Sequence, residues 1–157
     1  MSPLALPRLT DDEVLARLRE VAASAGARER LPLEVVHILK HNYPRYDWVG
    51  IYNLAKPDEL VLGPFLGKPS PHVRIRTDAG VCGAAVREEA TIVVDDVNAD
   101  PRYLACSLET KSEIVVPVFK ADRVVAEIDI DSHTPAAFTG HDRRLLEQVA
   151  EILAAAY

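Results

Sequence analysis

Three acidic side chains alternate with apolar ones along one short segment, Ala126-Glu127-Ile128-Asp129-Ile130-Asp131. Because successive side chains of a strand point to opposite faces, Glu127, Asp129 and Asp131 share one face, with neighbours about 7 Å apart. The simpler interpretation is a solvated sheet face. Aspartate is nevertheless poor in strands, and on a face that lines a pocket mutual repulsion raises at least one carboxyl pKa. Such a carboxyl could donate a proton or hold a cationic ammonium group.

The chain has two cysteines, and each stands in a segment that could make its thiol reactive. Cys82 lies in Gly-Val-Cys-Gly at the predicted start of a helix, where the partial positive charge of the helix end lowers a thiol pKa. The alternative is a small buried thiol in a close-packed helix. Cys106 lies in a predicted long loop, where a cysteine is more accessible than in a regular element. One nucleophile and one resolving thiol would complete a redox pair, but sequence separation does not tell whether the two sulfurs meet.

Trp48 and Tyr52 are four residues apart on a predicted strand, so they face the same side. They are either aromatic core or one wall of a small apolar pocket. The chain has no phosphate-binding Walker loop, dinucleotide fingerprint, CxxC pair or zinc-ligand pattern. We therefore expect no cofactor and no metal.

These residues need elements to position them, and the helices are the clearest. Thr10 and Glu13 form a capping box before an apolar helical stripe that ends at Gly26. A second helix is predicted over residues 31–41, with Pro44 preventing its continuation. A short helix of small residues is predicted over 81–88, and a final helix opens at Phe138-Thr139.

Strands fill most of the middle of the chain. The predicted strands cover residues 46–52, 59–66, 73–75, 91–94, 112–119 and 124–130, and residues 95–111 form a long loop. This order predicts an α+β fold with a mostly antiparallel sheet covered on one face by helices. The length of 157 residues suits one domain over 1–157, with a loose tail at 1–9.

Charge and hydropathy exclude several classes of protein. The net charge of −6 makes nucleic acid or an anionic membrane surface a poor partner. No apolar run approaches the roughly 20 residues of a membrane helix, and the first residues do not resemble a secretion signal. We expect a cytoplasmic protein with free thiols.

Five motifs in order give the chain a family resemblance. It resembles the free methionine-(R)-sulfoxide reductases, which are stand-alone GAF-domain enzymes, from about Pro44 to the final helix. The motifs are Asp47-Trp48-Val49-Gly50-Ile51-Tyr52, Leu62-Gly63-Pro64-Phe65-Leu66-Gly67-Lys68, Gly80-Val81-Cys82-Gly83, Ala105-Cys106 with Ser112-Glu113-Ile114-Val115-Val116-Pro117, and Ile128-Asp129-Ile130-Asp131-Ser132.

The resemblance implies a GAF-like antiparallel sheet of about six strands, with helices on one face and a closed pocket under loops on the other. It implies reduction of free methionine sulfoxide by way of a cysteine sulfenic acid and a disulfide, recycling by a thioredoxin-like dithiol, and a homodimer. Cys106 would be the nucleophile and Cys82 the resolving thiol. The remaining pocket residues would be Glu113, Asp129 and Asp131 at the sulfoxide oxygen and the substrate ammonium, and Trp48 and Tyr52 as the aromatic wall.

The chain departs from the family pattern at three places. His72 stands where the family commonly has a third cysteine, the usual His-Ile-Ala-Cys-Asp is Tyr103-Leu104-Ala105-Cys106-Ser107, and a glycine before the acidic strand is replaced in Ala126-Glu127. Without the third cysteine, recycling must use Cys82 or an external thiol. The alternative hypothesis is a non-catalytic GAF module that binds or senses a small molecule.

Overall fold

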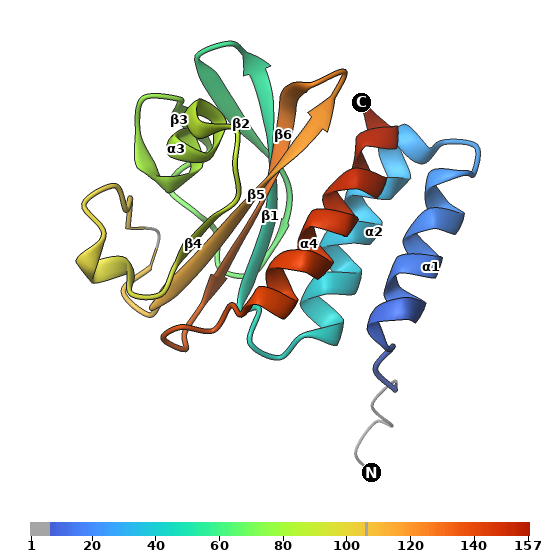
Figure 1. Cartoon of the computed structure of the whole chain (residues 1–157), viewed down its shortest axis with the longest axis horizontal. Helices are drawn as coiled ribbons and strands as arrows, with labels where there is room; N and C mark the ends of the chain where they lie inside the picture. The colour runs from blue at the N-terminus through green and yellow to red at the C-terminus, as the bar shows by residue number, and fades with distance from the viewer. Residues whose placement is uncertain (1–6, 106) are drawn as a thin grey trace.

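One antiparallel sheet of six strands forms the centre of the molecule (Figure 1). The computed structural model describes residues 7–105 and 107–157. The strand order across the sheet is β3-β2-β1-β6-β5-β4. The strands are β1 (Trp48–Lys56), β2 (Glu59–Leu66), β3 (Arg74–Arg76), β4 (Ile92–Val94), β5 (Ser112–Lys120) and β6 (Arg123–Ser132). The predicted α+β class and six-stranded antiparallel sheet are confirmed.

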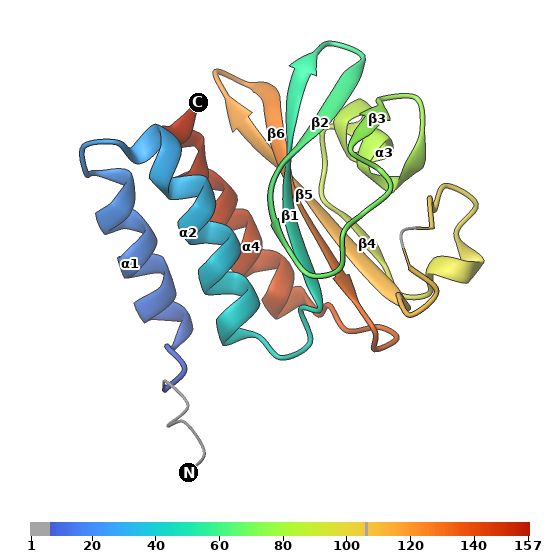
Figure 2. The same ribbon diagram turned by 180° about the vertical axis from the view of Figure 1, so that it is seen from behind.

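Three long helices lie on one side of this sheet: two of them pack on its face and the third, the first in the chain, packs outside those two, as Figures 1 and 2 show from opposite sides. They are α1 (Asp11–Ala22), α2 (Ala27–Asn42) and α4 (Gly140–Leu153). The short helix α3 (Gly80–Glu88) covers part of the other face, and the 3₁₀ turns η1 (Val97–Ala99) and η2 (Ala154–Ala156) complete the chain. Among the described residues, no helix is both long and apolar enough to cross a membrane.

The alternation along β6 divides the interior into two clusters. Ala126, Ile128 and Ile130 are fully buried on the face that α2 and α4 cover, in one apolar cluster with residues of the three long helices. The opposite face of the sheet carries a second apolar cluster, which includes Trp48 and Cys82. The acidic side chains of β6 lie on this second face, because neighbouring strand residues point to opposite sides.

Local signals set the helix ends. Thr10 and Glu13 form the predicted capping box at the start of α1. The second helix begins at Ala27, not at residue 31, because Gly26 adopts a left-handed conformation with φ 79° and its carbonyl accepts from the N–H groups of Glu29 and Arg30. The predicted helix covered the apolar stripe and missed this first turn, which carries no stripe of its own.

A buried carboxyl joins α4 to the start of β1. Thr139 and Asp142 form a second capping box, and the Tyr46 hydroxyl donates a 2.6 Å hydrogen bond to Asp142. Burial opposes the charge of Asp142, but hydrogen bonds from Tyr46 and Thr139 outweigh it and hold the pKa of this carboxyl below its usual range. This contact fixes the chain two residues before Trp48.

Candidate active site

The acidic face of β6 is buried. Glu127, Asp129 and Asp131 are 0%, 2% and 3% exposed, respectively. The simpler interpretation, a solvated sheet face, is therefore wrong. Loops and α3 cover this part of the sheet, and no local sequence pattern distinguishes a covered polar face from an open one.

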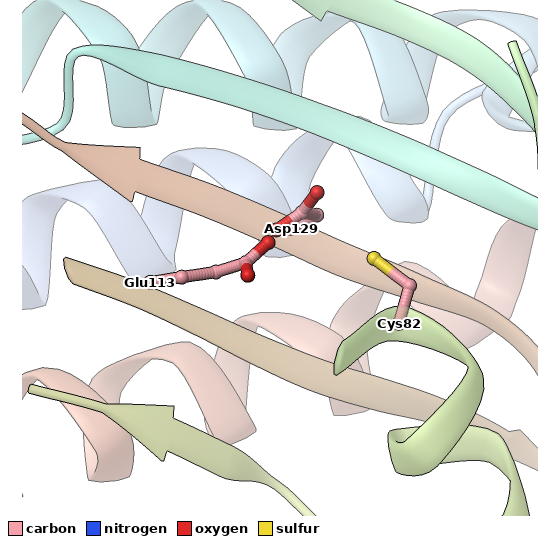
Figure 3. A group of neighbouring side chains, drawn as sticks. All are labelled: Cys82, Glu113 and Asp129. Atoms are coloured by element: carbon pink, nitrogen blue, oxygen red, sulfur yellow. The ribbon is translucent and has the colours of Figure 1, made fainter. Parts of the chain in front are cut away.

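A fourth carboxyl and a thiol converge on the same face. Glu113 on β5 pairs directly with Asp131 on β6, so their side chains share one side of the sheet. Cys82 reaches this face from α3 (Figure 3). Its sulfur, one oxygen of Glu113 and one oxygen of Asp129 lie within 4.8 Å of one another. Strand register and helix packing thus bring together side chains from three separate segments.

Burial favours the protonated form of these acids. It raises the pKa of Glu113 and of Asp131 well above the usual range, and it also raises the pKa of Asp129. The charges of both aspartates and hydrogen bonds to them raise the pKa of Glu113 further. Glu113 is therefore the carboxyl that most readily holds a proton and can donate it into the site.

The Cys82 thiol is held in its neutral form. Burial raises its pKa well above the ordinary value, and the charges of Asp129, Glu127 and Glu113 raise it further. The predicted lowering by the N-terminus of α3 is wrong, because loss of solvation and nearby negative groups outweigh about half a positive charge. The alternative, a small buried thiol in a close-packed helix, is what the structure contains.

Two aromatic rings form one wall beside the acids. Trp48 and Tyr52 lie on the same side of β1, with ring centroids 6.4 Å apart. The indole N–H of Trp48 donates to the Lys68 carbonyl over 2.9 Å, and Phe65 stacks on the indole with a centroid distance of 5.8 Å. Phe65 was not predicted as part of the wall. The sequence feature that could have indicated this role is its position in the Leu62–Lys68 motif.

Glycines make room for this wall. A Cβ added to Gly50 would lie 2.6 Å from Cζ3 of Trp48, and one added to Gly67 would lie 2.6 Å from its Cδ1. Gly67 also has a φ of +128°, which side chains of L-residues rarely adopt. The indole therefore occupies space that two missing side chains provide.

The enclosed space at the site is small. A cavity of about 10 Å³, comparable to the space for one water, is lined by Tyr52, His72, Ile75, Gly80, Val81, Cys82, Leu104, Glu113 and Asp129. A second cavity of about 50 Å³ is lined by Asp47, Trp48, Lys68, Ser70, Ser107, Thr110, Asp131 and His133. A larger surface groove of about 780 Å³ runs between α1 and α2, but the buried acids and thiol lie elsewhere.

Two loops close over these cavities and are tied to each other. His72, after β2, contacts the Ala105 carbonyl through Nε2 at 3.1 Å. Lys68 and Glu109 form an exposed ion pair of 2.6 Å between the same loops. The Tyr52 hydroxyl donates to the His72 carbonyl over 2.7 Å from below. These contacts hold the two loops together over the site.

Cys106, the predicted nucleophile, lies outside the described residues. Two described residues near it in the sequence line the cavities, Leu104 the first and Ser107 the second. Glu127 belongs with the site although it was not among the predicted site residues. The alternation that selected Asp129 and Asp131 also places Glu127 on this face.

A metal at the Cys82, Glu113 and Asp129 group would first have to displace protons. A thiolate and two carboxylates can ligate a divalent cation, but burial raises the pKa of all three groups. Metal binding releases those protons at a cost. The arrangement favours proton transfer beside a thiol.

Comparisons with known proteins place this site among relatives. A GAF domain model matches residues 14–157. GAF domain-containing protein A of Dictyostelium discoideum is 40% identical over 119 residues, covering 76% of this chain and 74% of that protein. The free methionine-R-sulfoxide reductase of Escherichia coli is 38% identical over 112 residues, covering 69% and 67%, respectively. The substrate complex of the Neisseria meningitidis free methionine-R-sulfoxide reductase superposes with a TM-score of 0.88 at 35% identity, covering 99% and 95%.

Proposed function

Because the chain belongs to the GAF-domain family, and within it to the free methionine-R-sulfoxide reductases, which are oxidoreductases, we propose that it reduces free methionine-(R)-sulfoxide to methionine. The observation that carries this proposal is the buried group of carboxyls, with raised pKa values, beside a thiol and an aromatic wall. Sulfoxide reduction needs an acid at the oxygen and a thiol at the sulfur.

Glu113 supplies the acid. The sulfur of a sulfoxide becomes electrophilic when its oxygen accepts a proton or a strong hydrogen bond, and Glu113 is the carboxyl most disposed to hold a proton. Asp129 and Asp131 accept from Glu113 and are positioned to hold the substrate ammonium. Trp48 and Tyr52 contact the apolar end of the substrate, since a thioether and its methyl group pack well on aromatic rings.

The thiols carry the electrons. The Cys106 thiolate attacks the sulfur of the protonated sulfoxide, and an S–S bond to the substrate forms as the S–O bond breaks and hydroxide leaves. Hydroxide then adds to the Cys106 sulfur, that S–S bond breaks, methionine leaves and Cys106 becomes a sulfenic acid. The Cys82 thiol then attacks that sulfenic sulfur, a disulfide forms and water leaves. An external dithiol of the thioredoxin type reduces the disulfide. Two observations support this order: the raised pKa of Cys82 disfavours it as the first nucleophile, because the thiolate is the attacking form, and Leu104 and Ser107, near Cys106 in the sequence, line the cavities.

The test is a thioredoxin-coupled assay with free methionine-(R)-sulfoxide, run beside the (S)-epimer and a peptide-bound sulfoxide. We expect turnover with the free (R)-form. Cys106→Ser should release no methionine, and Cys82→Ser should release about one equivalent and then stop. Binding of methionine without consumption of reductant by the wild type would instead establish the alternative, a non-catalytic binding or sensor module.

The proposed chemistry also indicates the compartment in which the protein acts. Recycling by a dithiol requires a reducing compartment, so the proposed place of action is the cytoplasm, where the enzyme recovers methionine after oxidative stress. We also propose a homodimer. Light scattering should then give a mass about twice the 17.3 kDa of one chain, and a mass of one chain would overturn this part of the proposal.

A further inference from the structure

Glu127 is a buried carboxyl that the proposed reaction leaves without a role. It is fully buried on β6, and neither of its carboxyl oxygens has a hydrogen-bond partner of ordinary geometry among the described residues. An unpartnered buried carboxyl costs stability. A residue that lowers stability at a site is a candidate for a function there.

The side chain that interacts with the Glu127 carboxyl as a donor is Cys82. On β5 the opposite residue is Pro117, which has no side-chain donor, and on β1 it is Tyr52, whose hydroxyl donates to the His72 carbonyl. The donor that acts on the Glu127 carboxyl is the Cys82 thiol of α3, and the charge of Glu127 acts in turn on that thiol. Asp129, the next residue on the same face of β6, is the other charged group that acts on Glu127.

Glu127 contacts the thiol but does not line the small cavity. The residues that line the small cavity include Cys82, Glu113 and Asp129, whereas Glu127, among the described residues, is not part of that lining. Cys82 reaches β6 from α3 (Figure 3). Glu127 is therefore placed to exchange a proton with Cys82, which does line the cavity.

We propose that Glu127 is the general base for Cys82, accepting the thiol proton as Cys82 attacks the sulfenic acid. This inference rests on the proposed function for the origin of the sulfenic acid. In the step the Cys82 S–H bond breaks, an S–S bond forms, and the S–O bond of the sulfenic acid breaks. The thiol proton passes to Glu127. The departing hydroxide takes a proton from the carboxyls of Glu113, Asp129 and Asp131 and leaves as water. Cys82 is oxidised and the sulfenic sulfur is reduced.

Burial also gives Glu127 the basicity that this role needs. It raises the pKa of the carboxyl well above its usual range, toward that of a thiol, and proton transfer is most efficient between groups of similar pKa. An ordinary exposed carboxylate would be too weak a base for a thiol whose own pKa is raised. Burial therefore raises the pKa of both Glu127 and Cys82, which keeps the two values close enough for proton transfer.

The test follows disulfide closure in Glu127→Gln, with Glu151→Gln, an exposed glutamate on α4, as the matched control. Reduced protein is mixed with one equivalent of free methionine-(R)-sulfoxide, quenched over time, and assayed for methionine and for the disulfide joining residues 82 and 106. Glu127→Gln should slow closure at least about tenfold more than it slows methionine release. The acting form is the deprotonated carboxylate, so wild-type closure should quicken as the pH rises through the raised pKa of Glu127, and Glu127→Gln should lose this rise. Glu151→Gln should match the wild type in both.

Hydrogen peroxide as a second oxidant separates this proposal from the proposed function. Peroxide converts a reactive thiol to a sulfenic acid without any sulfoxide, so closure is measured even if the protein does not reduce methionine sulfoxide. Slower closure of Glu127→Gln with peroxide supports the base role. Closure at the wild-type rate and with the wild-type pH profile would overturn it, and thermal unfolding of both variants checks that each is folded.

Discussion

Glu113 on β5 lies directly opposite Asp131 on β6, and both side chains are buried on the same face of the sheet. Directly opposed acids in a strand pair are unfavourable when both are charged. Burial is the largest cause of the raised pKa of Glu113, and the charges of Asp129 and of Asp131 opposite raise it further. Burial and the pairing register together thus supply an acid to the site.

Activity should fall on the alkaline side of its pH profile. The reaction needs protonated Glu113, and this proton is lost as the pH rises through the raised pKa of the carboxyl. Glu113→Gln should lower kcat about 10²- to 10⁴-fold and remove the alkaline fall. Initial rates with free methionine-(R)-sulfoxide across the pH range test this, and a Glu113→Gln enzyme with the wild-type profile would contradict it.

Asp129→Asn should move that alkaline fall to lower pH. The negative charge of Asp129 raises the pKa of Glu113, so removal of the charge lets Glu113 lose its proton earlier. Glu151→Gln on the surface should leave the profile in place. An alkaline fall at the same pH in Asp129→Asn and the wild type would remove Asp129 from the network.

Gly50→Ala should damage the aromatic wall. The added Cβ would overlap the Trp48 ring, which is stacked on Phe65 and cannot move freely. We expect a destabilisation of about 1–3 kcal/mol and a raised KM. Gly140→Ala at the start of α4, where the Cβ would meet only the flexible end of Arg144, is the control and should keep the wild-type KM. Equal KM values for the two variants would argue against Trp48 as a substrate contact.

Tyr52→Phe should loosen the cover of the site. It removes the hydrogen bond from the hydroxyl to the His72 carbonyl, a loss of about 0.5–1.5 kcal/mol. Tyr157→Phe is a matched control, because the Tyr157 hydroxyl contacts Asn53, away from the cavities. Urea denaturation should show similar losses for both variants, whereas kinetics should show a higher KM for Tyr52→Phe alone. A higher KM in both would point to a general loss of stability.

His72→Cys should restore turnover to Cys82→Ser. His72 contacts the Ala105 carbonyl, so a thiol at position 72 would lie beside the segment that carries the proposed nucleophile. Thioredoxin-coupled turnover should reappear in the double variant. His37→Cys, on the exposed face of α2, should not restore it. Recovery with both, or with neither, would contradict a local resolving role at position 72.

Glu127→Val should stabilise the protein by about 1–3 kcal/mol, because it removes, at similar volume, a buried carboxyl whose oxygens make no hydrogen bond of ordinary geometry. The raised pKa means that the folded state holds a proton which the unfolded state loses above about pH 4.5. In the wild type this contribution to the free energy of unfolding therefore declines as pH rises toward the folded pKa. Urea denaturation at pH 5 and pH 8 should show the larger gain at pH 8. A gain of equal size at both values would contradict a raised pKa for Glu127.

Patterns with a short range were readable from the sequence. The alternation along residues 126–131 placed three acids on one face, and the capping box at Thr10 and Glu13 located the start of α1. The prediction that Trp48 and Tyr52 lie on the same side of their strand followed from the same period of two. Each of these depends on neighbours within a few residues, so the chain determines them before it folds.

Other features depended on segments far apart. The pKa of Cys82 was predicted with the wrong sign, because the carboxyls that raise it come from β5 and β6 while the helix end that would lower it is local. Phe65 joined the wall through stacking on Trp48, and Glu127 gained its relation to Cys82 when α3 packed on the sheet. Burial and distance between such groups are properties of the packed molecule.

By itself the sequence determined which side chains share a face and which family the chain resembles. Only the tertiary structure decided that this face is closed from water, that Glu113 stands opposite Asp131, and that a neutral thiol lies among the acids. The physical reason is that side-chain direction follows from the backbone period, whereas solvation and charge interactions follow from which distant segments are brought into contact.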